Sequence, residues 1–212
     1  MRFRAFTGMG PEARGFDLAR WLDAAAAIET ELIELTTDLT EAQFHAPPRT
    51  GGWSIGHCIE HLILAGNALL PELDAALRRP NGAAQRVEQG RPYSWWQRKL
   101  LRYAESSGRL KLKTHQSSVP YLRRSINQTM AGFRDMHREL TRRACHLNGF
   151  DNRQARVRFP FAGWVRLSLA YSFDFVLAHE RRHLHQAARV RHQLLDLPPR
   201  VEPKQSGSRP VR

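Results

Sequence analysis

Cysteine is scarce in this sequence, with Cys58 and Cys145 the two examples among 212 residues. Two cysteines in a chain of this length cannot form the dense disulfide framework that holds small secreted domains together. Free cysteine usually behaves as a small buried apolar residue, so we expect both side chains in the core. The fold must then rest on a hydrophobic core, for which 42% hydrophobic residues are enough.

Long apolar runs are also missing. No stretch approaches the roughly 20 uninterrupted apolar residues that a membrane-spanning helix needs. The most apolar windows, 59–73 and 165–178, are interrupted by Glu, Asn, Asp or Ser. The chain opens on Met1-Arg2-Phe3-Arg4, but no apolar signal-peptide core follows. We therefore expect a cytoplasmic protein with no membrane partner.

Acidic residues are outnumbered, with 20 Asp and Glu against 33 Lys and Arg, which gives a formal charge of +13. Such an excess can indicate binding to nucleic acid or to an anionic surface. The basic residues are mostly scattered arginines, and their short clusters are not interleaved with aromatic residues as a base-stacking surface would be. We expect a solvated basic surface and no specific nucleic-acid partner.

Apolar residues recur at helical spacing in four segments. These segments run from Asp17, a plausible N-cap, to the prolines at 47–48, from 53 to about 80, from Pro120 to 149, and from about Trp164 to Leu194. They predict an all-α four-helix bundle over 17–197, preceded by an irregular lead-in over 1–16 and followed by a disordered basic tail over 198–212. One short strand is expected near Val157–Phe159.

The connection between the second and third helices is unusually long. Residues 82–118 hold Gly, Pro and Ser around one short candidate helix, Ser94–Tyr103, which begins with Trp95 and Trp96. A connection of this length in a bundle can serve as a cap or lid. The simpler interpretation is that the two tryptophans cover one end of the core. We favour this simpler interpretation and keep a pocket cap as the alternative.

Histidines on the fourth helix give the sharpest functional signal. His179 and His183 are four residues apart, so they lie about 40° apart on a helix, within the apolar stripe. This spacing offers two imidazoles to one metal ion such as Zn²⁺, Ni²⁺ or Fe²⁺. The alternative is two hydrogen-bonded core histidines, although two polar rings on one apolar stripe are costly unless paired or ligated. Gln186 shares this face, whereas His185 points away.

Further ligands must come from other helices. The second helix offers His57 and His61, neither of them at the centre of its stripe, and His137 lies on the stripe of the third helix. Helical angles alone do not choose among these three.

Residues 179–183, His-Glu-Arg-Arg-His, also match the zincin protease pattern, with Glu180 as general base. The metzincin extension requires Gly at 186 and His at 189, where glutamine and arginine stand. The other common arrangement requires a later Glu on a helix, and the one Glu after 180 is Glu202, in the tail. We therefore do not expect a protease.

Two stretches together resemble the DinB-like superfamily. Residues 53–62, Trp-Ser-Ile-Gly-His-Cys-Ile-Glu-His-Leu, resemble its W-S-x6-H-L segment, and residues 179–186, His-Glu-Arg-Arg-His-Leu-His-Gln, resemble its H-x3-H-x2-Q segment. Residues 93–120 resemble the long second connection of one uncharacterised branch. The resemblance covers roughly residues 17–194. It implies a four-helix bundle and a divalent metal held by three histidines, which map to His61, His179 and His183.

The resemblance therefore favours His61 over His57. A three-histidine site with open positions is of the catalytic type, with bound water or thiol as the reactive group. Members of the family are described as thiol S-transferases, mycothiol-dependent isomerases or metal hydrolases. We expect a thiol S-transferase-like activity on a small molecule, with a low-molecular-weight thiol as cosubstrate. A hydrolase and a non-catalytic binding or stress-response module are the alternatives. Gln186 is expected to orient a ligand or bound water, and a homodimer is one option.

Overall fold

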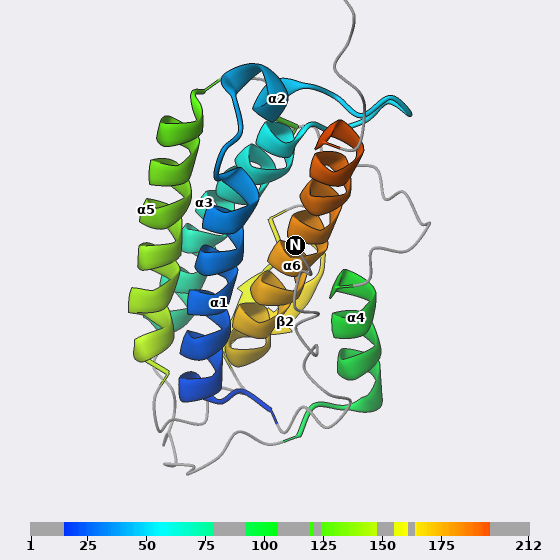
Figure 1. Cartoon of the computed structure of the whole chain (residues 1–212). Helices are drawn as coiled ribbons and strands as arrows, with labels where there is room; N and C mark the ends of the chain where they lie inside the picture. The colour runs from blue at the N-terminus through cyan, green and yellow to red at the C-terminus, as the bar shows by residue number, and fades with distance from the viewer. Residues whose placement is uncertain are drawn as a thin grey trace, which may run out of the picture.

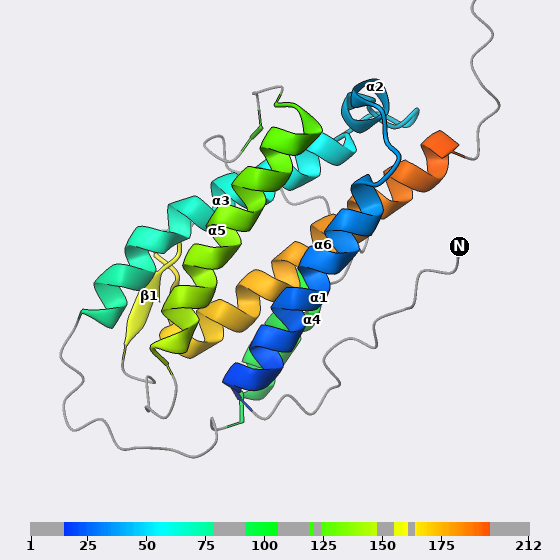
Figure 2. The ribbon, with the colours of Figure 1, turned by 60° about the vertical axis from the view of Figure 1, so that its left-hand side comes forward.

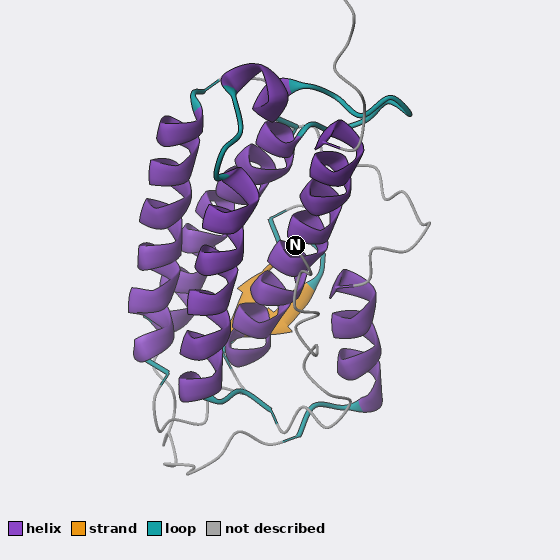
Figure 3. Cartoon of the chain, viewed as in Figure 1, coloured by secondary structure: helices purple, strands orange, loops and turns teal. Residues whose placement is uncertain are grey.

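Four long helices form the body of the protein in a computed structural model (Figures 1 and 3). The structure describes residues 15–78, 92–105, 119–120, 124–147, 155–160 and 164–195. The four helices are α1 (Leu18–Thr36), α3 (Ile55–Leu77), α5 (Ile126–Cys145) and α6 (Leu169–Leu195). The predicted all-α four-helix bundle with a long second connection is confirmed.

Each helix of the bundle contacts two others. Both α1 and α3 pack against α5 and α6, and the core lies between the four (Figures 1 and 2). The short helix α2 (Glu41–His45) lies at the end of the bundle where α3 and α5 begin (Figure 1). Buried Phe44 of α2 packs so closely on α3 that a Cβ at Gly56 would lie 2.8 Å from its ring. A glycine at 56 therefore permits this contact.

Polar side chains mark where the helices begin. Asp17 accepts the N–H of Arg20, which confirms it as the N-cap of α1. Ser54 accepts the N–H of His57 at the start of α3. Ser125 and Gln128 form a capping box, so α5 begins at Ile126 and not at Pro120 as predicted.

The first helix is shorter than predicted. It ends at Thr36 and not near Pro47, because Asp38 adopts the left-handed conformation with φ of 61°. Thr40 and Gln43 then form a capping box that begins α2. Leu39, which fits the helical spacing of α1, lies in this break and still packs against the core.

The fourth helix also begins later than predicted. Residues 166–168 form a strand, β2 (Arg166–Ser168), which pairs antiparallel with β1 (Arg156–Arg158). Val157 of β1 is buried and lies opposite Leu167, which confirms the strand expected near 157–159. The residues before Leu169 alternate between basic and apolar or small side chains, a pattern that suits a strand as well as the edge of a helical stripe.

The long connection contains α4 (Trp95–Glu105), which confirms the predicted short helix. It packs against the outer side of α6 (Figure 1). The hydroxyl of Tyr93 donates to Oδ2 of Asp174 at 2.6 Å, and that of Tyr171 donates to the carbonyl of Gln97 at 2.9 Å. These two bonds hold the first turn of α4 beside the first two turns of α6.

The structure also bears on the predictions for the two cysteines, for membrane-spanning helices and for the two ends of the chain. Cys58 is buried as predicted, but Cys145 is exposed at the end of α5, so its core placement was wrong. Within the described residues, no helix is long and apolar enough to cross a membrane. The predicted tail and most of the lead-in lie outside the described residues, although Phe16 packs against the core. The proposed domain limits remain a prediction.

Candidate metal centre

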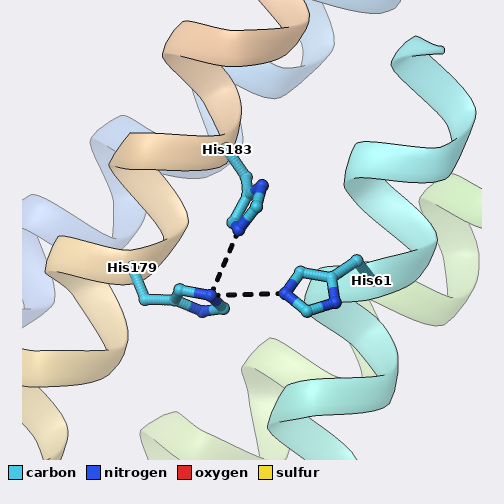
Figure 4. Close-up of side chains that lie close together, drawn as sticks. All are labelled: His61, His179 and His183. Carbon is cyan, nitrogen blue, oxygen red and sulfur yellow. Dashed lines mark hydrogen bonds between the residues drawn. The ribbon is translucent and has the colours of Figure 1, made fainter. Parts of the chain in front are cut away.

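Three of the predicted site residues come together between α3 and α6. His61 lies on the second turn of α3, and His179 and His183 lie on successive turns of α6 (Figure 4). Each offers one nitrogen, and these three atoms all lie within 4.8 Å of one another. Nε2 of His179 is 3.3 Å from Nε2 of His61 and 3.2 Å from Nε2 of His183. His179 is therefore the central ring of the cluster.

The cap of α3 explains why His61, and not His57, enters this cluster. Ser54 caps the helix, and its Oγ lies 2.7 Å from Nδ1 of His57. One turn later, His61 is buried on the side that faces α6. His185 is exposed on α6. The structure thus brings together the three predicted histidines, while His57 binds the cap and His185 faces solvent.

Trp53 forms one wall of the cluster, a role that its position in the sequence did not predict. Its ring centroid lies 4.8 Å from that of His61 and 5.7 Å from that of His183, and the second pair is stacked at 26°. Trp53 precedes the N-cap of α3, so it falls outside any helical stripe. Its place at the start of the W-S motif was the one available signal.

Burial and crowding keep two of the three rings uncharged. Burial, together with His61 and Arg182, lowers the pKa of His179 to about 3. Burial, together with His179, His61 and Arg182, lowers the pKa of His183 to about 2. A neutral imidazole keeps a lone pair on one nitrogen, which is the form that binds a metal ion. At neutral pH neither ring has to lose a proton before it can bind a cation.

Gln186 fixes the tautomer of His183. Its Oε1 lies 3.2 Å from Nδ1 of His183. An amide oxygen only accepts hydrogen bonds, so Nδ1 must carry the proton and Nε2 must carry the lone pair. That Nε2 is the atom facing His179. Such a contact behind a metal-binding histidine commonly orients the ring.

The spacing of the nitrogens fits a metal ion. Three nitrogens bound tetrahedrally to Zn²⁺ at about 2.0–2.1 Å would lie about 3.3 Å from one another. The two Nε2 separations at His179 are 3.3 and 3.2 Å. Imidazole nitrogens are also ligands that Zn²⁺, Ni²⁺ and Fe²⁺ accept. The role of His61, His179 and His183 as metal ligands remains a prediction that this geometry supports.

His137, the rival ligand, lies in a different environment. Its Nδ1 is 2.7 Å from Oε1 of Glu29, and its Nε2 is 3.4 Å from Oε2 of Glu180, an ion-pair contact. Burial opposes charge on this ring, but the carboxylates of Glu180 and Glu29 raise its pKa to about 9. A protonated imidazole has no lone pair to offer a metal ion.

The acidic neighbours of the ligands face elsewhere. Glu180, the general base of the zincin motif, contacts His137 on α5. Glu60 is buried and accepts the backbone N–H of Arg124 at 3.2 Å. Glu180 and Glu60 thus each contact a partner outside the histidine cluster.

Trp95 and Trp96 lie at the surface. Their rings contact each other, with centroids 4.3 Å apart. They begin α4 near the level of Tyr171, and Tyr171 precedes His179 by eight residues, or roughly 12 Å along a helix. The interpretation that the two tryptophans cover one end of the core was wrong, because their side chains are exposed and belong to neither core cluster. The alternative role as a pocket cap remains a prediction, and this placement gives it no support.

Two proteins that resemble this chain, one in sequence and one in structure, carry names that refer to metal-dependent hydrolases. A 76-residue stretch is 33% identical to a Bacillus pumilus protein named "Putative metal-dependent hydrolase", covering 36% of this chain and 40% of that protein. The chain thus spans less than half the length of this relative. The solved structure of YfiT from Bacillus subtilis, described as "a probable metal-dependent hydrolase with an unusual four-helix bundle topology", matches with a TM-score of 0.51. That match has 16% identity and covers 82% of this chain and 85% of YfiT.

The family model of the DinB superfamily matches residues 24–187, which include all three clustered histidines. It covers more than half of the 212 residues, and the chain therefore belongs to the DinB superfamily.

Proposed function

We propose that the protein is a metal-dependent hydrolase of a small molecule, with His61, His179 and His183 as the metal ligands. The observation that carries this proposal is the pair of Nε2 separations at His179, 3.3 and 3.2 Å. A divalent ion in a three-histidine site lowers the pKa of a bound water to near 7 and so supplies a nucleophile at neutral pH.

The chain's own residues prepare this site in three ways. Burial keeps the rings of His179 and His183 neutral. Gln186 turns the lone pair of His183 toward the other two rings. Trp53 covers two of the rings with apolar surface, which keeps part of their water away. Exclusion of water strengthens electrostatic interactions within a site.

Hydrolysis has more support here than thiol transfer. The names of the Bacillus pumilus relative and of YfiT both refer to hydrolases. Within the chain, burial raises the pKa of the Cys58 thiol to about 12, so this thiol is not a nucleophile. Cys145 is exposed at the end of α5 and is not part of the histidine group. A transferase would need a thiol from outside, and that activity remains a prediction without support from the comparisons.

The test begins with protein purified without a histidine tag, because a tag binds the same metals. We expect about one divalent ion per chain by elemental analysis, and hydrolysis of at least one substrate in a panel of simple esters, amides and phosphoesters. His179→Ala should lose both metal and activity. His185→Ala, at an exposed position on the same helix, should keep both.

Two results would contradict the proposal. Protein without bound metal, even after incubation with Zn²⁺, Ni²⁺ or Fe²⁺, would leave the cluster as hydrogen-bonded core histidines. Turnover that depends strictly on an added low-molecular-weight thiol would replace hydrolysis with thiol transfer at the same site.

A further inference from the structure

The outer side of α4 exposes large apolar side chains. Trp95 is 57% exposed, Trp96 68% and Leu100 40%. Among the described residues seven large hydrophobic side chains are exposed, and these three share one 11-residue helix. Single exposed apolar residues are ordinary on a protein surface, but a cluster of this kind indicates an interaction site.

Basic side chains lie within the same face. At about 100° per residue, Lys99 falls between Trp95 and Trp96, and Arg102 falls beside Trp95. The ammonium of Lys99 lies 5.2 Å from the ring centroid of Trp95 and 5.7 Å from that of Trp96. We name these five residues, Trp95, Trp96, Lys99, Leu100 and Arg102, the α4 outer face.

The opposite side of α4 is fixed to the protein. Leu101 and Ala104 are buried in a small core with Tyr171 and Ala178 of α6. The hydrogen bond from Tyr93 to Asp174 secures the beginning of α4. The helix therefore cannot bury its outer face by rotating, and α4 stands at the side of the bundle (Figure 1).

We infer that the α4 outer face binds an anionic membrane surface. Tryptophan is enriched at the boundary between lipid and water, where its ring is apolar and its N–H is hydrated. Lysine and arginine place their stems against apolar surface and their charges among headgroups. A short helix with tryptophans, leucine and cations on one face therefore has the composition of a segment that lies in this boundary. This inference is independent of the proposed hydrolase activity.

Charge and ring geometry favour this partner over two others. The chain carries a formal charge of +13, which favours an anionic partner and opposes a second copy of the same chain. The ammonium of Lys99 is near both indole rings, and the rings contact each other at 68°. This arrangement leaves no parallel ring platform for successive nucleic-acid bases.

Among the described residues no helix is long and apolar enough to cross a membrane, and a short helix that lies on a bilayer surface does not need that length. The inference therefore revises the expectation of no membrane partner. It also gives a reason for two exposed tryptophans that neither pocket nor core requires.

The test uses the full chain and vesicles of phosphatidylcholine, alone or mixed with phosphatidylglycerol. We expect co-sedimentation with the mixed vesicles, little with phosphatidylcholine alone, and weaker binding as salt rises. The double variant Trp95→Ser/Trp96→Ser should bind at least about tenfold more weakly, given the apolar area that two indoles bury. The control Trp164→Ser/Leu195→Ser removes two exposed apolar side chains elsewhere and should bind as the wild type does.

A second pair of variants tests the charges. Lys99→Gln/Arg102→Gln should weaken binding by about fivefold per cation. The control Arg138→Gln/Arg142→Gln makes the same change of charge on exposed residues of α5 and should have a smaller effect. Circular dichroism would confirm that all variants keep the fold, as expected for exposed positions.

Three results would overturn the inference. One is absence of binding to the mixed vesicles, and another is an equal loss in the α4 variants and their controls, which would indicate a general effect of surface charge. The third is a wild-type protein that binds RNA or forms dimers, together with α4 variants that lose this property and still bind vesicles as the wild type does.

Discussion

At the scale of single residues, His57 and His61 show how one turn of helix decides a role. Helical angle does not separate them, because neither lies at the centre of the apolar stripe of α3. The cap does separate them, because Ser54 holds the ring of His57 at 2.7 Å while His61 extends to within 3.3 Å of His179. These two residues therefore make a matched pair for mutation.

We predict that replacing His61, His179 or His183 by alanine abolishes binding of a divalent metal, because each removes one of three ligands. His57→Ala and His185→Ala should bind metal nearly as the wild type does. Isothermal titration with Zn²⁺ and Ni²⁺ measures this directly. Loss of binding in His57→Ala together with its retention in His61→Ala would show that the family motif had been mapped to the wrong histidine.

Gln186 gives a second prediction, concerning orientation. Gln186→Ala removes the acceptor of the Nδ1 proton of His183 and should lower metal affinity by about 10–100-fold, with the three ligands still present. Gln193→Ala, a substitution of the same residue type at an exposed position of α6, is the control. Equal affinities of the two variants would mean that Gln186 does not orient the ligand.

The sequence predicted the clustered residues better than their surroundings. Spacing alone identified His179 and His183, because two rings four residues apart must share a helical face. The third member needed the family resemblance, since the cap that excludes His57 depends on side-chain geometry. Trp53 was missed because its contacts with the rings of His61 and His183 depend on how α3 packs against α6. Residue spacing along the chain does not predict that packing.

At the scale of elements, His137 connects three helices. Its ring lies on α5 and contacts Glu29 of α1 and Glu180 of α6. Glu180 adjoins His179, so this ion pair also holds the turn of α6 that carries the cluster. Both His137 and Glu180 are almost fully buried, and a buried charge that loses its partner is strongly destabilising.

A pH dependence of stability follows. The pKa of His137 is raised to about 9 in the fold, against about 6.5 when unfolded, so the native state binds this proton more tightly. The resulting stabilisation is complete below about pH 6.5 and is lost as pH rises through 9, a change of roughly 3 kcal/mol at most. Urea unfolding followed by circular dichroism between pH 6 and about 9.5 measures it.

The variant His137→Gln isolates this contribution. Its free energy of unfolding should be lower than that of the wild type by roughly 3 kcal/mol near pH 6, and the difference should narrow as pH rises. His185→Gln, at an exposed site, should follow the wild-type profile. A constant difference between His137→Gln and the wild type across this range would mean that His137 is neutral in the fold.

Element boundaries were predicted where a local signal exists and missed where two signals compete. The N-cap at Asp17 is local, and it was found. The end of α1 was missed because Leu39 continues the helical spacing beyond the left-handed Asp38. Residues 165–168 were assigned to the last helix because a strand of three residues is too short for its alternating pattern to be distinguished from the end of a helical stripe. Its pairing partner β1 lies ten residues earlier, so no local signal marks the pairing.

At the scale of the whole molecule, the histidine cluster joins α3 to α6 on the side of the bundle opposite α5 and α1. A metal ion bound there would link the first half of the chain to the last helix. Since the unfolded chain does not assemble such a site, binding should stabilise the entire fold. The size of this effect depends on the free metal concentration relative to the dissociation constant.

We predict that saturating metal raises the melting temperature of the chelator-treated protein. At a free metal concentration of about 100 times the dissociation constant, the gain is about 2.7 kcal/mol. For a domain of roughly 150–250 residues this corresponds to about 5–10 °C. Thermal unfolding followed by circular dichroism, with Zn²⁺ or Ni²⁺ added after chelation, gives the measurement.

The same thermal unfolding measurement on variants tests whether the metal ion binds at the histidine cluster between α3 and α6. His61→Ala and His183→Ala remove ligands from opposite sides of the cluster, and neither should respond to metal. His57→Ala should show the full increase, because its ring binds Ser54 and contributes nothing to the cluster. If metal raises the melting temperature of all three variants equally, the ion binds elsewhere on the protein, and the three histidines serve only to pack α3 against α6.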